Sequence, residues 1–235
     1  MMPPTSSLAA NLERIQERIA RAAERAGRAA GDITIVAVSK TFPAEAIRAA
    51  FAAGLRHFGE NRVQEWESKA PLVADLGATW HLIGHLQSNK ARRAANLFHC
   101  VDSVDSLPLA EKLDAAAGAE GKRLRVLIEV HLGAEATKTG VPESELPKLA
   151  EGIAPLPHLE LLGLMTIPPF SENPEHARPH FRKLHELRDG LSQRVRIVLP
   201  VLSMGMSHDF EVAIEEGATE IRVGTALFGE RAAKA

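Results

Sequence analysis

Short apolar runs alternate with amphipathic stretches along most of this chain. The apolar runs are rich in β-branched residues and have the length of buried strands, whereas the stretches between them repeat apolar positions at helical spacing. Eight runs predict strands, at residues 33–39, 56–60, 79–84, 98–104, 123–130, 160–167, 197–204 and 219–224. The helical stretches include residues 44–53, 89–96, 143–153, 174–193 and 209–216. The chain is therefore predicted to repeat a βα unit.

Eight such units predict an α/β fold, a single (β/α)8 TIM barrel. An extra N-terminal helix precedes the first strand, because Leu8, Leu12, Ile15 and Ile19 recur at helical spacing and form one apolar stripe. The alternative is an open, doubly wound sheet, but the first βα turn lacks the G-x-G-x-x-G pattern that binds a dinucleotide. No linker or low-complexity tract divides the chain, so we expect one domain over residues 1–235.

Composition narrows the possible partners and the compartment. The formal net charge is −2, so the chain has no basic excess for binding nucleic acid. Cys100 is the single cysteine, which excludes an intramolecular disulfide and is compatible with a reducing cytosol. The segment 1–30 carries glutamates among its arginines and has no continuous apolar run, so neither a signal peptide nor a spanning helix is predicted. We expect a cytoplasmic protein without a membrane partner.

The first predicted strand ends in Lys40, and Pro43 then suits the start of a helix. Lys40 therefore lies at the carboxyl edge of the strands, where βα loops vary above a rigid core and where barrel enzymes place their chemistry. An amine at that edge can form a Schiff base with a carbonyl compound. The alternative is an ordinary surface lysine in a βα loop.

Hydroxyl and backbone donors follow the last two predicted strands. Ser207 is expected to be the N-cap of the helix over 209–216, and Gly224 and Thr225 close the eighth strand. Barrels often hold a phosphate between the loops after strands seven and eight, so these residues are candidates for a phosphate site. The alternative for Ser207 is a helix cap with no ligand.

Three further positions are candidates for the same pocket. Arg222 lies two residues before Gly224 and should face the barrel interior, where the alternative is a core ion pair with Glu60 or Glu129. Two more residues lie at the carboxyl ends of the second and sixth strands and could line the pocket or simply cap a strand: Asn61 and Met165.

Two histidine pairs with four-residue spacing raise the question of a metal site. His81 and His85 follow an apparent strand, where four residues span roughly 13 Å, too far to share one ion. His176 and His180 lie on a polar helical stretch without a zinc-protease signature, so a solvated helix face is the better interpretation. No metal site is predicted.

Taken together, these segments resemble the pyridoxal 5′-phosphate (PLP) homeostasis proteins, a family with the fold of the alanine racemase N-terminal barrel. The resemblance covers residues 8–231 approximately, with markers AVSK (37–40), FGEN (58–61), HLIGHLQSNK (81–90), LMT (164–166), SMGMS (203–207) and RVGTALFGE (222–230). It implies a PLP-binding barrel with Lys40 as N6-(pyridoxal phosphate)lysine. It also implies phosphate contacts from Ser207, Gly224 and Thr225, Arg222 at the pyridine nitrogen, and Asn61 and Met165 beside the ring. His131 departs from the family pattern, which has asparagine there, and its role stays open.

The resemblance also bears on enzymatic activity. Alanine racemases use a lysine and a tyrosine from a second domain as two bases, and this chain has no tyrosine and ends shortly after its eighth predicted strand. We therefore expect no two-base racemisation and a monomer. The expected function is intracellular buffering or delivery of PLP, possible recipients being PLP-dependent apoenzymes, with no catalytic residue. The alternatives are a slow one-base PLP-dependent racemase or lyase, and a cofactor-free Schiff-base aldolase.

Overall fold

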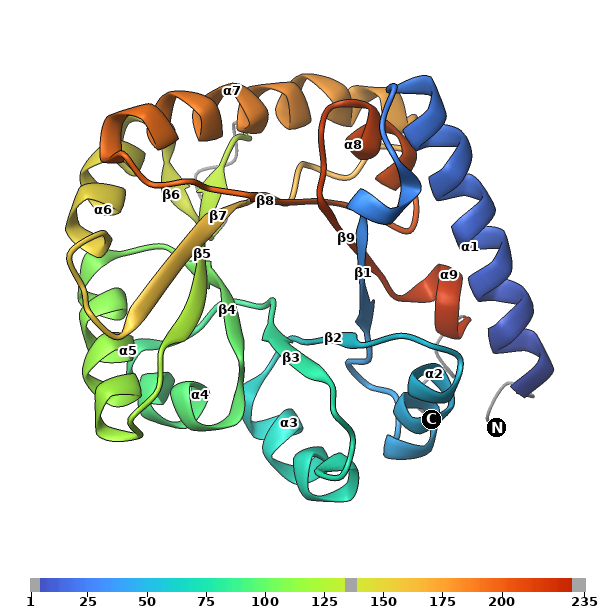
Figure 1. Cartoon of the computed structure of the whole chain (residues 1–235), viewed down its shortest axis with the longest axis horizontal. Coiled ribbons are helices and arrows are strands. Elements are labelled where there is room, and N and C mark those ends of the chain that lie inside the picture. The colour runs from blue at the N-terminus through green and yellow to red at the C-terminus, as the bar shows by residue number, and fades with distance from the viewer. Residues whose placement is uncertain (1–4, 134–138, 230–235) are drawn as a thin grey trace.

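Eight parallel strands close into a barrel in the computed structural model, which describes residues 5–133 and 139–229 (Figure 1). Neighbouring strands along the chain pair in order, and pairing of the first strand with the last completes the ring. The barrel strands are β1 (Thr34–Val38), β2 (His57–Glu60), β3 (Thr79–Leu82), β4 (Cys100–Val104), β5 (Leu124–His131), β7 (Leu159–Met165), β8 (Val201–Met206) and β9 (Glu220–Val223). A two-residue strand, β6 (Val141–Pro142), pairs with the carboxyl end of β5. The predicted (β/α)8 barrel is confirmed.

Helices surround this barrel as an outer ring (Figure 1). They are α1 (Thr5–Arg25), α2 (Ala44–Ala52), α3 (Val63–Lys69), α4 (Ala91–Leu97), α5 (Leu107–Ala119), α6 (Leu146–Ile153), α7 (Arg178–Val195), α8 (Phe210–Glu215) and α9 (Thr225–Phe228). Short 3-10 turns occur at Ala30–Asp32, Ala70–Val73, Ser88–Lys90, Glu143–Glu145 and Pro174–Ala177. Within the described ranges, no helix is long and apolar enough to cross a membrane.

The apolar stripe predicted near the N-terminus is buried, as expected. Leu8, Leu12, Ile15 and Ile19 on α1 are all nearly inaccessible to solvent, and α1 packs against α8 and α9 beside the last strand (Figure 1). The strand predictions match within a few residues, with the largest shift at the seventh, where β8 begins at Val201. Glu230, which ends the last marker, lies outside the described residues.

The core has two chemically different parts. Between the barrel and its helices it is apolar, and its largest fully buried side chains include Trp66, Phe58, Phe98, Phe181 and Phe210. Inside the barrel, several polar and charged side chains are buried: His81, Asp102, Ser203, Glu220 and Arg222. Successive residues of a strand point to opposite faces, so each strand contributes to both parts.

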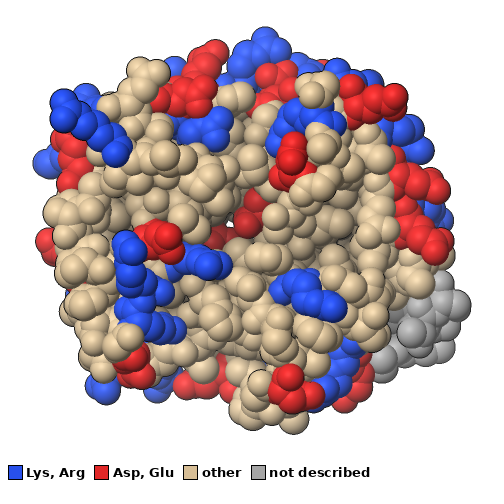
Figure 2. Space-filling model, in the orientation of Figure 1, with Lys and Arg blue, Asp and Glu red and all other residues tan. Residues whose placement is uncertain are grey.

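Charge on the visible outer face is mixed. Figure 2 shows acidic and basic side chains interspersed around the rim, in keeping with a formal net charge of −2. That the chain is one domain and has no nucleic-acid partner stays a prediction.

Candidate functional site

A pocket of about 490 Å³ lies at the carboxyl ends of the barrel strands. Its lining comes from seven of the eight barrel strands and the loops that follow them, which the barrel brings to one rim. It includes six of the residues predicted from the sequence: Lys40, Asn61, Ser207, Arg222, Gly224 and Thr225. Met165, the seventh, ends β7 and is fully buried, and it does not belong to the lining.

The turn that carries Lys40 is tightly held. Ser39 N donates to the Gly59 carbonyl of β2, and Phe42 N donates to the Ser39 carbonyl at 3.1 Å, so residues 39–42 form a closed turn. Thr41 has a φ of 69°, a left-handed conformation that is unusual for a β-branched residue. Lys40, which is partly exposed, is thereby directed into the pocket from the end of β1.

The donors after β8 and β9 lie side by side, but not as the sequence predicted. Ser207 does not cap α8, since that helix begins at Phe210 after Asp209. The Ser207 hydroxyl instead accepts a hydrogen bond from Ala226 N in α9, at 3.2 Å. The expected cap was wrong because α9, nineteen residues further along the chain, folds back beside the β8 loop. The contact brings Ser207 next to Gly224 and Thr225, where β9 passes into α9.

Arg222 is fully inside the barrel, with 3% of its surface exposed. Its Nη1 donates to the Ser203 hydroxyl at 2.7 Å and its Nη2 to the Thr166 carbonyl at 2.8 Å. The alternative ion pair with Glu60 or Glu129 is not what the guanidinium forms. Glu60 binds Lys69, and Glu129 accepts from Thr139. Burial lowers the pKa of Arg222, and the nearby Glu220 and Asp102 carboxylates oppose that shift.

Another group of polar side chains lies inside the barrel, where His81 and Asp102 are buried and His57 is half-buried. His57 Nδ1 lies 3.0 Å from His81 Nε2, and His81 Nδ1 lies 3.0 Å from Asp102 Oδ2. The Asp102 carboxylate raises the pKa of His81 well above its usual value despite burial, whereas burial and the His81 charge lower the pKa of His57 to about 4. Burial also raises the pKa of Glu220.

The polar side chains around His81 raise the question of whether the protein holds a metal ion there. Ligand atoms of His81, Cys100 and Asp102 lie within 4.8 Å of one another, a grouping that the histidine spacing did not suggest. Both ring nitrogens of His81 already have partners in His57 and Asp102, which describes a hydrogen-bonded core cluster. His85 lies beyond β3, with its Nδ1 3.3 Å from Asp105 Oδ2. The absence of a metal site stays a prediction.

Sequence reasoning missed several residues of the pocket. Phe170, which is 80% exposed, and Ile167 line it from the loop after β7, and the Phe170 ring lies 5.8 Å from the His208 ring. Thr139 joins the lining from beyond β5. A signal was present in the long Pro-rich loop after the sixth predicted strand, since such βα loops often cover barrel sites. His131 ends β5 and is not part of the lining.

Over nearly its full length, this chain is similar to known proteins. The family model described as the N-terminal domain of alanine racemase matches residues 10–232. The pyridoxal phosphate homeostasis protein of Aquifex aeolicus is 50% identical over 220 residues, covering 94% of this chain and 96% of that protein. Its Escherichia coli K12 counterpart is 42% identical over 231 residues, covering 96% and 97%.

Solved structures extend the comparison. PipY from Synechococcus elongatus, with PLP bound, is 39% identical with a TM-score of 0.85, covering 94% of this chain and 100% of that one. Alanine racemase from Corynebacterium glutamicum is 19% identical with a TM-score of 0.68, covering 97% of this chain and 62% of the racemase, and shows the shared fold alone. With this identity over nearly the full length of its relatives, the chain belongs to the pyridoxal phosphate homeostasis protein family, within the fold group of the alanine racemase N-terminal domain.

Proposed function

We propose that this chain binds PLP through a reversible Schiff base at Lys40 and buffers or delivers it in the cytoplasm. The observation that carries the proposal is one pocket lined by Lys40, Arg222 and the donors around Ser207. Relatives that are 42% and 50% identical are named for PLP homeostasis, and PipY was solved with PLP bound. The cellular role is then maintenance of the PLP pool, and so of vitamin B6 balance.

The pocket residues fit the chemical groups of PLP. PLP supplies an aldehyde, which a neutral lysine amine converts to a Schiff base with loss of water. Lys40 provides that amine in the lining. Ser207, Thr225 and the backbone at Gly224 would hold the phosphate, because hydroxyl and N–H groups donate strong hydrogen bonds to an anion. The pocket volume of about 490 Å³ lies within the usual range for small-molecule sites.

Two residues are proposed to position the pyridine ring. Asn61 would contact it from the pocket wall, and Met165 would pack near it from the buried end of β7.

Arg222 would face the ring nitrogen, where a guanidinium, which only donates, disfavours a protonated pyridine. An unprotonated ring withdraws electrons weakly, so carbanion chemistry would be poorly supported.

A carrier without robust turnover is the form of the proposal that these residues support. No tyrosine occurs in the 235 residues to act as the second base of a racemase. We further propose that the chain acts as a monomer and a single barrel domain over residues 1–235. PLP-dependent apoenzymes would be its recipients.

One observation favours a second candidate, a slow PLP-dependent enzyme. A neighbouring pocket of about 640 Å³ shares Asn61 and His85 with the first and is lined also by Arg62 and Lys90. Such cationic groups could hold the carboxylate of an amino acid beside Lys40. A cofactor-free aldolase that uses Lys40 is the remaining alternative.

The test is a visible spectrum of the purified protein with and without added PLP, followed by borohydride reduction and peptide mass analysis. We expect one adduct per chain, on Lys40, which Lys40→Ala removes and Lys90→Ala in the neighbouring pocket leaves intact. An adduct on other lysines in the wild type would refute the site. Multiple product turnovers per chain from an added amino acid, absent in Lys40→Ala, would favour the enzyme over the carrier.

A further inference from the structure

A cluster of charged residues outside the barrel packs against the turn that carries Lys40. It consists of Glu60 on β2 and of Glu65 and Lys69 on α3, which face the turn from the helix side of the sheet. We propose that α3 positions the Lys40 amine, with Glu65 and Lys69 acting as positioning residues. This inference rests on the proposed function of Lys40.

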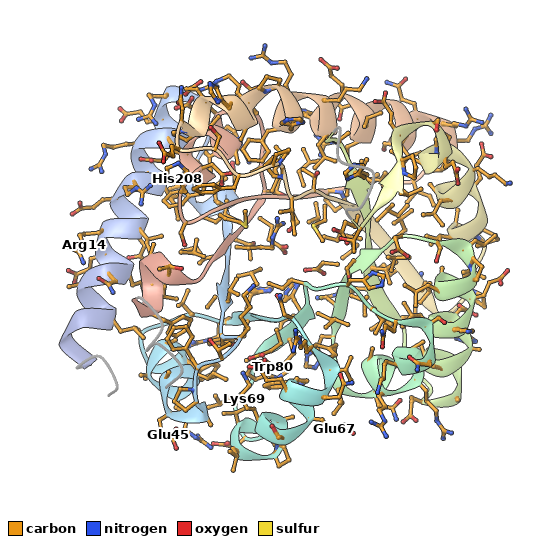
Figure 3. The ribbon with its side chains drawn as sticks, turned by 180° about the vertical axis from the view of Figure 1, so that it is seen from behind. Arg14, Glu45, Glu67, Lys69, Trp80 and His208 are labelled. Atoms are coloured by element: carbon orange, nitrogen blue, oxygen red, sulfur yellow. The ribbon has the colours of Figure 1, made fainter. Side chains whose placement is uncertain are left out.

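Lys69 holds the turn on both sides of Lys40. Its Nζ donates to the Ser39 carbonyl at 3.1 Å and to the Phe42 carbonyl at 3.4 Å. Only 8% of Lys69, the last residue of α3, is exposed, and Figure 3 shows it on the side of that helix that faces α2. A buried ammonium needs acceptors, and two of those that it uses are the backbone oxygens at the two ends of this turn.

Glu65 holds the middle of the same turn. Its Oε1 accepts a short hydrogen bond from Thr41 N and also lies 3.1 Å from Lys69 Nζ. Thr41 occupies the position after Lys40 with a positive φ, a place in a turn that glycine usually takes. A β-branched residue persists in that conformation only where its surroundings over-determine it. The carboxylate of Glu65 provides that constraint at the residue adjacent to Lys40.

Glu60, at the end of β2, is the third residue of the cluster. Its Oε1 accepts from the Ser39 hydroxyl and from Lys69 Nζ, each at 2.7 Å. Burial raises the pKa of Glu60, and Lys69 and the Ser39 hydroxyl oppose the shift. A structural ion pair alone would need only Lys69 and Glu60. The additional bonds from α3 to Ser39, Thr41 and Phe42 all end on the backbone of the turn, which is the basis of the positioning role.

The first experiment compares Glu65→Ala with the conservative Glu65→Gln, which keeps an acceptor oxygen. The matched control is Glu67→Ala, two residues along the same helix, where the carboxylate is exposed and pairs with Arg93. Amide hydrogen exchange of Thr41 is measured by NMR in protein without PLP, and the rate of borohydride-trapped adduct formation on Lys40 is measured after PLP is added.

We expect Glu65→Ala to lose protection of the Thr41 amide and to form the adduct about tenfold or more slowly, because a small misplacement of a reacting group is costly. Glu65→Gln should restore both values, and Glu67→Ala should match the wild type. Unchanged Thr41 exchange and unchanged rate in Glu65→Ala would overturn the inference. Equal slowing in Glu67→Ala would also overturn it, by pointing to general weakening of α3.

A second pair of variants examines Lys69. Lys69→Met is compared with Lys122→Met, in which a half-buried lysine that donates to the Phe98 carbonyl is lost from a site outside the pocket lining. Slower adduct formation in Lys69→Met alone, with a folded NMR spectrum, would support the role. Equal rates in both variants would overturn it. A wild type that forms no adduct would reject the proposed function, whereas Thr41 exchange would still decide the positioning of the turn.

Discussion

The hydroxyl of Ser207 accepts a hydrogen bond from the backbone N–H of Ala226 at 3.2 Å. This contact joins the loop after β8 to the first turn of α9, which follows β9. The two segments contribute Ser207, Gly224 and Thr225 to one side of the pocket. The hydrogen bond therefore holds the two halves of the proposed phosphate site together.

Replacement of Ser207 by alanine should weaken PLP binding. A hydrogen bond to a charged group contributes about 1.5–3 kcal/mol, so Kd should rise roughly tenfold or more. Pyridoxal, which lacks the phosphate, should lose little affinity. Spectrophotometric titration with both compounds measures the difference, and Ser192→Ala, whose hydroxyl donates to the Ile197 carbonyl, serves as control. Equal losses for PLP and pyridoxal would contradict a phosphate role for Ser207.

Gly84→Ala should disturb Asn61 at the pocket wall. A Cβ at Gly84 would overlap the Asn61 carbonyl oxygen, whereas one at Gly77 would meet nothing within 4 Å. Because backbone cannot yield as a flexible side chain does, we expect Gly84→Ala to lower the melting temperature and PLP affinity, and Gly77→Ala to change neither. Thermal unfolding and PLP titration of both variants provide the measurement. Wild-type behaviour of Gly84→Ala would show that the loop can shift freely.

Arg222→Gln should destabilise the barrel even without PLP. The guanidinium is buried among carboxylates, chiefly Glu220 and Asp102, and removal of one partner from a buried charge cluster typically costs about 3–5 kcal/mol. Arg222→Lys should recover only part of the loss, because an ammonium lacks the planar fork that reaches both Ser203 and Thr166. Urea unfolding measures the free energies, with exposed Arg21→Gln as control. A loss no larger than that of Arg21→Gln would argue against this electrostatic account.

His57 should make the protein sensitive to mild acid. Burial and the His81 charge lower its pKa from 6.5 to about 4, so the folded state binds fewer protons than the unfolded chain. The stability due to neutral His57 is complete above pH 6.5 and is lost as the pH falls toward 4. His57→Gln should therefore show a shallower fall in unfolding free energy across this range, measured by urea unfolding at several pH values.

The pKa of His81 is shifted in the opposite direction to that of His57, so the two histidines affect stability at opposite ends of the pH range. Its raised pKa means that the folded state retains a proton, so its contribution is complete below the unfolded pKa and is lost as the pH rises through the folded value. Substitution of His57 should leave the alkaline side of the stability profile largely in place. An unchanged acid slope in His57→Gln would show that His57 is not the group that titrates.

The barrel and six residues of the pocket lining could be predicted from local sequence. Lys40, Gly224 and Thr225 each follow an apolar run, and parallel strands bring their carboxyl ends to one edge. Arg222 was expected inside by strand alternation and lies there. The hydrogen-bond partners of the Arg222 guanidinium were not predictable, because the residue that a buried group meets depends on how the strands are staggered around the barrel.

The role proposed for α3 shows more clearly what local sequence cannot predict. In sequence, Glu65 and Lys69 are an ordinary i,i+4 pair of the kind that stabilises a solvated helix. In the structure they are directed at the turn after β1, more than twenty residues earlier in the chain. Spacing along one element carries no information about which distant backbone groups will lie against it.

Thus the sequence by itself determined the strand and helix order, the barrel, and the residues at its carboxyl edge, because hydrophobic periodicity and strand direction are local properties. Tertiary structure alone decided that Ser207 binds Ala226, that Arg222 binds Ser203 and Thr166, and that Lys69 holds the Lys40 turn. These contacts join segments distant in sequence, and closure of the barrel selects each partner by position.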